Sequence, residues 1–312
     1  MATPALVFAS NSDDPVAWSA ALRACMPELD VRVWPETGRA EDVVAALVWR
    51  HPDGALNAFP NLKLVINLGA GVDPIFADPH LPRAIPIVRL VDPELTRGMT
   101  EYVVLHVLAL HRRMPELAAA QRDARWHYIH PPDTRLARVG LMGLGNLGGD
   151  AAQMLARFGF KLSGWSRRPK TLAGIDCFHG SDQLPRFLGD LDILVCLLPL
   201  TRETENMIDA AVLAHLPTGA AFLNAGRGRT VVDADLLAAL DAGRLRHATL
   251  DVFRDEPLPP DHRYWRHPRV TITPHNATAG HPESAAPQIV DNIRRVLAGA
   301  APINVVDRDA GY

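Results

Sequence analysis

The sequence predicts an α/β protein built on two doubly wound parallel sheets. Short apolar runs alternate with segments of helical spacing along the whole chain. The runs are continuously apolar, which is typical of parallel strands that helices cover on both faces. The 312 residues exceed the usual size of one domain, and the alternation restarts in the middle of the chain, so we expect two domains.

The expected elements follow in chain order. Strands of the first half are predicted at Ala5–Ala9, Val31–Trp34, Val44–Trp49, Leu62–Asn67 and Ile85–Leu90. Strands of the second half are predicted at Arg138–Met142, Lys161–Trp165, Ile193–Leu197, Ala220–Asn224, Ala248–Val252 and Val270–Thr273. Helices are predicted at Pro15–Met26, Asn146–Phe158, Asp233–Ala242 and Glu283–Ala298.

A long connector lies between the two halves. The segment Pro93–Ala124 has helical spacing, and Glu101–His111 within it is almost uniformly apolar, which predicts a buried helix that passes between two domains. The following stretch from Trp126 to Arg135 contains two histidines and two prolines and is expected to be an extended arm.

The composition argues against several classes of function. Lys plus Arg number 32 and Asp plus Glu 35, a net charge of −3, whereas a general nucleic-acid binder should carry a basic excess. Only three of the basic residues are lysines. No apolar run approaches the roughly 20 residues of a membrane helix, and the first residues lack the basic region of a signal peptide. Three widely spaced cysteines fit a reducing compartment and no metal site, so we expect a cytoplasmic protein without membrane or nucleic-acid partners.

A glycine-rich turn follows the first strand of the second half. The spacing Gly143-x-Gly145-x-x-Gly148 lies between a predicted strand and a predicted helix, the context that a dinucleotide-binding turn requires. Gly143 would permit the tight turn, Gly145 the approach of a pyrophosphate and Gly148 the packing of the helix on the sheet. The N–H groups at the start of that helix would face the phosphates.

The end of the next strand predicts which dinucleotide binds. Proteins that select NAD usually place an acidic residue about 20 residues after the turn, where it bonds the ribose 2′-hydroxyl. Here the chain has Ser166, Arg167 and Arg168, a hydroxyl and two guanidinium groups that suit a 2′-phosphate. We therefore predict NADPH in preference to NADH, with two ordinary surface arginines as the alternative.

Three later residues form a candidate catalytic set. Arg227, Glu256 and His275 each follow a predicted strand, and ligands of open α/β sheets bind beyond the carboxyl ends of strands. Reduction of a 2-oxo acid needs a cation for the carboxylate, which Arg227 could supply with two parallel hydrogen bonds. It also needs a proton donor for the carbonyl oxygen, and His275 could supply that proton while Glu256 holds the protonated imidazole.

The order of these motifs resembles the D-isomer-specific 2-hydroxyacid dehydrogenases. Asp-x-Phe-x-x-Glu-Pro at Asp251–Pro257 and Thr-Pro-His at Thr273–His275 carry the resemblance, with Leu68–Asp73 similar to the family's substrate loop. Finer features resemble the glyoxylate/hydroxypyruvate reductase A branch, including Trp49-x-His51-Pro52 and Met99–Tyr102. The stretch Asn276–His281 departs from that branch, which leaves the shape of the pocket beside the nicotinamide open.

The resemblance implies a Rossmann dinucleotide-binding domain at 101–286, inserted in a flavodoxin-like substrate domain formed by 1–100 and 287–312. It implies a homodimer to which the arm contributes, and NADPH-dependent reduction of glyoxylate or hydroxypyruvate with Arg227, Glu256 and His275 as catalytic residues. Further cofactor contacts are expected at Asn146, Leu147, Leu198, Pro199, Thr204, Ala225 and Asp251. Substrate contacts are expected at Trp49, Ala70, Gly71 and Met99, besides Arg227 and His275.

Two other functions remain open from the sequence. One is a reductase of another 2-ketoacid, of the phenylpyruvate or pyruvate type. The other is a nucleotide-sensing protein on the same fold without turnover.

Overall fold

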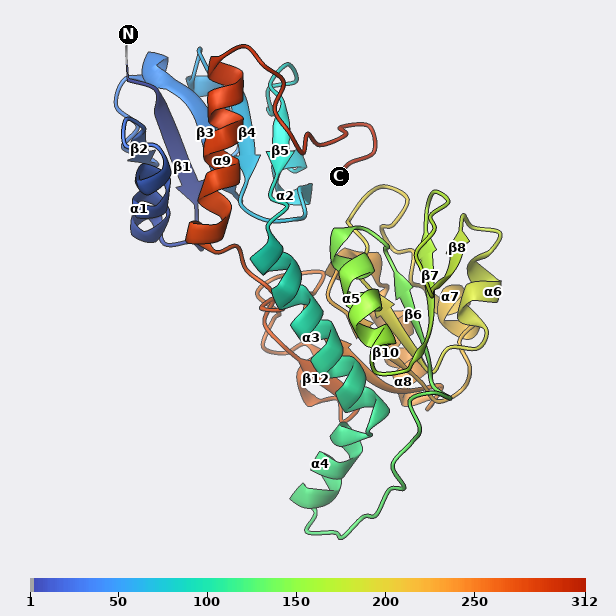
Figure 1. Ribbon diagram of the computed structural model, residues 1–312. Helices are drawn as coiled ribbons and strands as arrows, with labels where there is room; N and C mark the ends of the chain where they lie inside the picture. The colour runs from blue at the N-terminus through green and yellow to red at the C-terminus, as the bar shows by residue number, and fades with distance from the viewer. Residues whose placement is uncertain (1–2) are drawn as a thin grey trace. The chain divides into compact units, whose positions relative to one another are not determined.

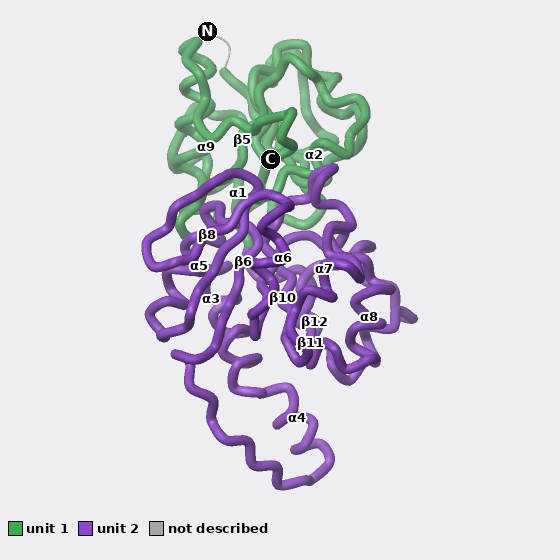
Figure 2. The backbone as a smooth tube through the Cα atoms, turned by 90° about the vertical axis from the view of Figure 1, so that its right-hand side faces the viewer, with its two compact units in different colours: residues 1–95, 279–312 green, residues 96–278 purple. Residues whose placement is uncertain are grey.

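The computed structural model describes residues 3–312 and divides the chain into two compact units (Figure 2). The first unit comprises residues 1–95 and 279–312, and the second comprises 96–278. Both boundaries lie a few residues before the expected ones, 95 against 100 and 278 against 286. The second boundary differs because the last helix, α9 (Pro282–Leu297), belongs wholly to the first unit and is not divided at residue 287.

The first unit contains a five-stranded parallel sheet in the order β2-β1-β3-β4-β5 (Figure 1). Its strands are β1 (Ala5–Ser10), β2 (Asp30–Val33), β3 (Val43–Trp49), β4 (Leu64–Asn67) and β5 (Ile87–Arg89). Its other elements are α1 (Pro15–Cys25), η1 (Ala40–Asp42), η2 (Ala55–Ala58), α2 (Asp73–Phe76) and α9. The strand order 2-1-3-4-5 is that of flavodoxin-like sheets, as expected.

Alternating strand residues build a separate core on each face of this sheet. Leu6 and Phe8 of β1 lie in the cluster beneath α1 and α9, whereas Val7 lies in the cluster on the opposite face, with η2 and α2. All three side chains are at most 1% exposed. The continuous apolar runs of the sequence thus have the predicted cause, burial on both faces.

The second unit contains a seven-stranded parallel sheet in the order β12-β11-β10-β9-β6-β7-β8. Its strands are β6 (Arg138–Met142), β7 (Lys161–Ser166), β8 (Asp176–His179), β9 (Ile193–Cys196), β10 (Ala220–Asn224), β11 (Leu245–Leu250) and β12 (Val270–Ile272). Counted from β6, the order is that of a Rossmann sheet with one added strand, and the direction of connection reverses between β6 and β9. The predicted fold class is confirmed.

Helices cover both faces of the second sheet. The elements are α3 (Pro93–His111), α4 (Met114–Arg122), α5 (Asn146–Ala156), α6 (Leu184–Leu188), α7 (Ala210–Ala214), η3 (Gly228–Thr230), α8 (Asp233–Asp241) and η4 (Arg263–Arg266). Side chains of α3 and α5 form one core with the sheet, and those of α6, α7 and α8 form the other. Among residues 3–312, no helix is both long and apolar enough to cross a membrane.

Several features differ from the expected elements, and the short helices α2, α6 and α7 were not predicted. The helical segment 93–124 is not one helix, because Arg113 adopts a left-handed conformation with φ +59° between α3 and α4. Strand β8 was not predicted, since Asp176–His179 combines charged and half-buried residues at the edge of the sheet. The arm from Trp126 to Arg135 forms neither helix nor strand.

Candidate active site

The glycine-rich turn joins β6 to α5 at the carboxyl edge of the second sheet. Gly143 has φ +101°, which residues with a side chain rarely adopt. A Cβ on Gly148 would stand 1.9 Å from the carbonyl oxygen of Gly143, so the helix lies this close to the strand only with glycine. A Cβ on Gly145 would meet nothing within 4 Å. Open space beside the N-terminus of α5 fits the pyrophosphate of a dinucleotide.

The other expected cofactor residues also lie at the carboxyl ends of strands in this sheet. They are Asn146 and Leu147 at the start of α5, Ser166–Arg168 at the end of β7, Leu198, Pro199 and Thr204 after β9, Ala225 after β10 and Asp251 after β11. The Thr204 hydroxyl donates to the carbonyl oxygen of Pro199 at 2.7 Å. Its place in the fold is therefore to hold the loop after β9.

The segment after β7 brings three cations to this edge. The Ser166 hydroxyl donates to the carbonyl oxygen of Arg168 at 2.8 Å, while Arg167 lies 4.0 Å from Glu203 and both arginines are exposed. Lys170 follows, and its Nζ donates to the carbonyl oxygen of Leu144 in the glycine-rich turn at 2.6 Å. Sequence reasoning missed Lys170, because only the fold shows that this segment turns back over the glycine-rich turn.

The side chains of His275 and Glu256 are hydrogen-bonded to each other. The imidazole Nδ1 lies 2.7 Å from Glu256 Oε2, and Glu256 Oε1 accepts the backbone N–H of Phe253 at 3.0 Å. Because the carboxylate binds Nδ1–H, the other ring nitrogen, Nε2, carries the exchangeable proton. Nε2 has no hydrogen-bond partner within residues 3–312, and the His275 side chain is 32% exposed. This is the geometry that general acid–base catalysis requires.

The carboxylate of Asp251 accepts several hydrogen bonds from the protein itself, which the sequence did not indicate. The residue is 1% exposed. Its Oδ1 accepts the Thr273 hydroxyl at 2.6 Å and the N–H of Asn276 at 3.0 Å, and its Oδ2 accepts the N–H of Ala277 at 3.0 Å. Three of about four acceptor sites of the carboxylate are thus used. In this structure Asp251 anchors the loop of His275, and little of the carboxylate remains for the expected cofactor contact.

Arg227 lies in a loop fastened to the end of β10. Asn224 donates from Nδ2 to the carbonyl oxygen of Arg227 at 3.1 Å, and its Oδ1 accepts the N–H of Gly226 at 3.1 Å. A Cβ on Gly228 would stand 1.9 Å from the backbone carbon of Phe253. The loop of Arg227 therefore touches the loop that carries Glu256, and the structure brings the three expected catalytic residues to one edge of one unit.

The first unit holds three of the expected substrate contacts. Trp49 ends β3 and packs against Gly69, where a Cβ would stand 2.9 Å from the indole ring. Asn67 Nδ2 donates to the carbonyl oxygens of Gly69 and Gly71, at 2.6 and 3.0 Å. No hydrogen bond within the described residues engages the N–H groups of Ala70 or Gly71. The fourth, Met99, lies in the core beneath α3 of the second unit and is 5% exposed.

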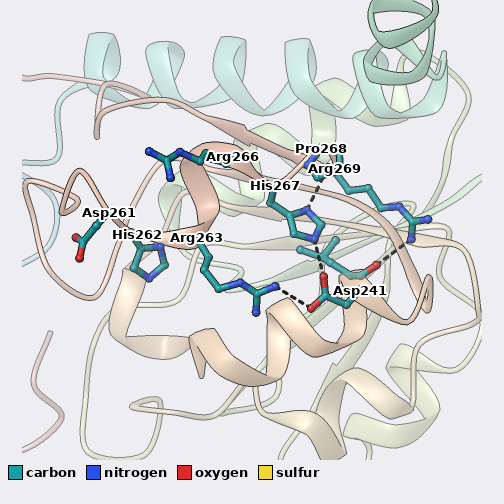
Figure 3. A pocket seen from close by; sticks show the side chains of 9 residues that line it. Asp241, Asp261, His262, Arg263, Arg266, His267, Pro268 and Arg269 are labelled. Carbon is teal, nitrogen blue, oxygen red and sulfur yellow. Dashed lines mark hydrogen bonds and ion pairs between the residues drawn. The ribbon is translucent and has the colours of Figure 1, made fainter.

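A shallow pocket of about 430 Å³ lies elsewhere in the second unit, around η4 (Figure 3). None of the candidate catalytic or cofactor residues lines it. In this pocket, the carboxylate of Asp241 forms an ion pair with Arg263 at 3.1 Å and lies 3.2 Å from His267 Nε2, so it is already bonded within the protein. We therefore place the candidate active site at the strand ends and not in this hollow.

Comparison with known proteins decides the family. A model of the NAD-binding domain of D-isomer specific 2-hydroxyacid dehydrogenases matches residues 104–277. The chain belongs to this family. It is similar to the glyoxylate/hydroxypyruvate reductase A proteins of Serratia proteamaculans, at 42% identity over 95% of this chain and 96% of the relative, and of Yersinia enterocolitica, at 40% over the same shares. The expected family and branch are confirmed.

Solved structures agree over nearly the whole chain. A D-isomer specific 2-hydroxyacid dehydrogenase from Xanthobacter autotrophicus, in complex with NADPH and MES, is 49% identical with a TM-score of 0.96 and full coverage of both chains. An NADPH-dependent glyoxylate/hydroxypyruvate reductase from Sinorhizobium meliloti, with NADP and sulfate, is 36% identical with a TM-score of 0.93, covering 99% of this chain and 100% of that one. As expected, the protein is an NAD(P)-dependent oxidoreductase of 2-hydroxy acids and their 2-oxo counterparts.

Proposed function

We propose that the protein reduces a small 2-oxo acid with NADPH, converting glyoxylate to glycolate and hydroxypyruvate to glycerate. The observation that carries the proposal is the 2.7 Å pair of His275 and Glu256 beside the Arg227 loop, at the carboxyl edge of a dinucleotide-binding sheet. The names of the similar proteins support the choice of substrates.

The residues present fit the cofactor. Gly148 and Gly143 bring α5 and β6 together, and the space beside Gly145 is open to a pyrophosphate. The segment after β7 offers exposed cations and no carboxylate, which suits the 2′-phosphate of NADPH. Relatives crystallised with NADPH or NADP support the same preference. NADPH, when bound, supplies the hydride.

The protein's own residues would handle the substrate carboxylate and the proton. Arg227 would bind the carboxylate with two parallel N–H donors. His275 would donate the Nε2 proton to the carbonyl oxygen as the hydride reaches the carbonyl carbon. The side chain of His275 would then be a neutral imidazole. Glu256 would stabilise the imidazolium before that transfer through Nδ1–H. In the first unit, the N–H groups of Ala70 and Gly71 stay proposed contacts of the carboxylate.

A panel of 2-oxo acids, measured with NADPH and with NADH, tests the assignment. We expect the highest kcat/KM with glyoxylate or hydroxypyruvate and NADPH, and a fall of about 10³-fold in kcat for His275→Ala with an unchanged Kd for NADPH. A higher kcat/KM with phenylpyruvate or pyruvate would show that one of these acids is the substrate instead. Cofactor binding without turnover of any acid would make the protein a sensor, and unchanged turnover of His275→Ala would refute the catalytic role.

The test of cofactor choice is the double replacement of Arg167 and Arg168 by alanine. We expect kcat/KM with NADPH to fall at least tenfold while kcat/KM with NADH changes little, since only NADPH carries the 2′-phosphate. A preference of the unaltered protein for NADH would overturn this part of the proposal.

We further propose a homodimer in the cytoplasm. Large apolar side chains of α3, α4 and the arm are exposed, among them Leu105 at 62%, Trp126 at 98% and Tyr128 at 75%, and a second copy of the chain would cover them. Three free cysteines and the use of NADPH support the compartment. Sedimentation should give twice the chain mass of 34.0 kDa, and Trp126→Ala should weaken the dimer.

A further inference from the structure

A chain of three hydrogen-bonded polar groups, of which Tyr102 and Asp251 are buried and Thr273 is half-buried, lies behind the loop of His275. Tyr102 of α3 is 8% exposed, and its hydroxyl lies 2.7 Å from Thr273 Oγ1, at the end of β12. Thr273 Oγ1 donates in turn to Asp251 Oδ1 at 2.6 Å. Helix α3 and strand β12 belong to the same unit (Figure 2), and the bond joins residues that are 171 positions apart in the sequence.

The direction of these hydrogen bonds follows from the number of protons available. The ionised carboxylate of Asp251 only accepts, and the single hydroxyl proton of Thr273 is given to it. Tyr102 must therefore donate to Thr273. Burial, together with the nearby charge of Asp251, raises the pKa of Tyr102, so the phenol keeps its proton and remains a donor at any working pH.

The loop of His275 has an uncommon backbone conformation that hydrogen bonds to Asp251 hold in place. His275 has φ +52°, an uncommon conformation for a residue with a side chain, and such conformations persist where the surroundings hold them. Its N–H donates to the carbonyl oxygen of Asp251 at 2.8 Å, and the next two N–H groups donate to the Asp251 carboxylate. Each of the three backbone N–H groups of residues 275–277 thus bonds Asp251, and that of His275 is shared with the carbonyl oxygen of Thr273 at 3.1 Å.

Helix α3 contacts this segment at both ends. Gly98 lies one turn before Tyr102, on the same face of the helix, and a Cβ there would stand 2.7 Å from Thr278 Oγ1. Tyr102 bonds the residue two positions before His275, and Gly98 packs against the residue three positions after it. Helix α3 therefore contacts the segment Thr273–Thr278 at its first and last residues.

We propose that Tyr102 is a positioning residue for the proton transfer, acting through Thr273 and Asp251 on the backbone that sets the direction of the His275 imidazole. The role in catalysis rests on the proposed function, whereas the hold on the loop does not. Phenylalanine at this position would fill the same space and leave Thr273 Oγ1 without its donor.

The test compares Tyr102→Phe with the unaltered protein in two measurements. Amide hydrogen exchange of residues 275–277 should become about tenfold faster, while exchange in β6 and β9 stays unchanged. In the reductase assay, kcat should fall about tenfold with the Kd for NADPH unchanged. In a His275→Ala background, Tyr102→Phe should cause no further loss of kcat, because it acts only through the imidazole.

Two further variants keep the outcome decisive. Thr273→Ser retains the hydroxyl and should behave as the unaltered protein, whereas Thr273→Val should reproduce Tyr102→Phe. Tyr264→Phe is the matched control, because that buried phenol donates to Asp233 at 3.1 Å, away from the loop, and should change neither measurement.

Unchanged exchange in Tyr102→Phe, or a loss of protection spread over the whole unit, would overturn the proposal. If the unaltered protein reduced no 2-oxo acid, the proposed function would fail while the exchange measurement still decided the role of Tyr102.

Discussion

Replacing His247 by glutamine should make the protein less sensitive to acid. His247 lies on β11 and is 6% exposed, with Nε2 2.9 Å from Thr271 Oγ1 on β12. Burial, assisted by the positive charge of Arg246, lowers the pKa of His247 from 6.5 to about 4. Asp251 and Thr273 directly follow these two strands, so the histidine lies in the strand pair that leads to the candidate active site.

The sign and size of the effect follow from this pKa. The folded protein favours neutral His247, so its contribution to stability is complete above pH 6.5 and is lost as the pH falls from 6.5 towards 4. The difference between the two pKa values corresponds to about 3 kcal/mol of the free energy of unfolding. Of this, about 2 kcal/mol should be lost between pH 7 and pH 5.

Urea unfolding at pH 7 and pH 5, followed by tryptophan fluorescence, measures the difference. On acidification, His247→Gln should lose about 2 kcal/mol less than the unaltered protein, because glutamine has no proton to take up. His215→Gln, at an exposed position outside the arm, serves as the control and should follow the unaltered protein. Equal losses for His247→Gln and the unaltered protein would refute the reasoning.

Three other replacements test the candidate site. Glu256→Gln removes the charge that holds the imidazolium, so kcat should fall at least tenfold in steady-state assays with an unchanged Kd for NADPH, and unaltered kcat would remove Glu256 from the mechanism. Arg227→Lys replaces a planar guanidinium, which can bind a carboxylate with two parallel hydrogen bonds, by a single ammonium group. We expect kcat/KM for the 2-oxo acid to fall by about 100-fold, and near-normal kinetics would exclude a bidentate contact. Gly148→Ala places a Cβ 1.9 Å from the carbonyl oxygen of Gly143 and should abolish NADPH binding in a fluorescence titration. The control is Gly149→Ala, whose Cβ meets nothing within 4 Å and which should bind NADPH normally. Equal binding by both variants would contradict the role of Gly148 in the cofactor site.

The sequence predicted those parts of the candidate site that lie at the carboxyl ends of parallel strands. Parallel strands bring their carboxyl ends to one edge, so the glycine-rich turn, Arg227, Glu256 and His275 could be assigned to that edge from the strand pattern alone. The same pattern predicted both sheets, because residues buried on two faces form continuous apolar runs.

Other parts of the site depend on contacts that no local pattern encodes. The hydroxyl of Tyr102 meets Thr273 across 171 positions, and although Tyr102 belongs to a motif that carries the resemblance, no local pattern indicates this partner. Asp251 follows a strand like the other candidates, and the sequence does not indicate that its carboxylate holds the backbone of the His275 loop. Lys170 reaches Leu144 through a turn whose path the sequence does not indicate.

The order of the elements along the chain has a consequence for biosynthesis. Helix α9 is translated after the whole second unit, yet its Ile289 and Ile293 are completely buried in the first unit, in the same cluster as Trp18 and Leu22 of α1. On the ribosome, residues 96–278 can complete their fold while one face of the first sheet still lacks its cover. A nascent chain stalled before residue 282 should therefore expose a large apolar surface to chaperones, and release of the last residues should end that exposure.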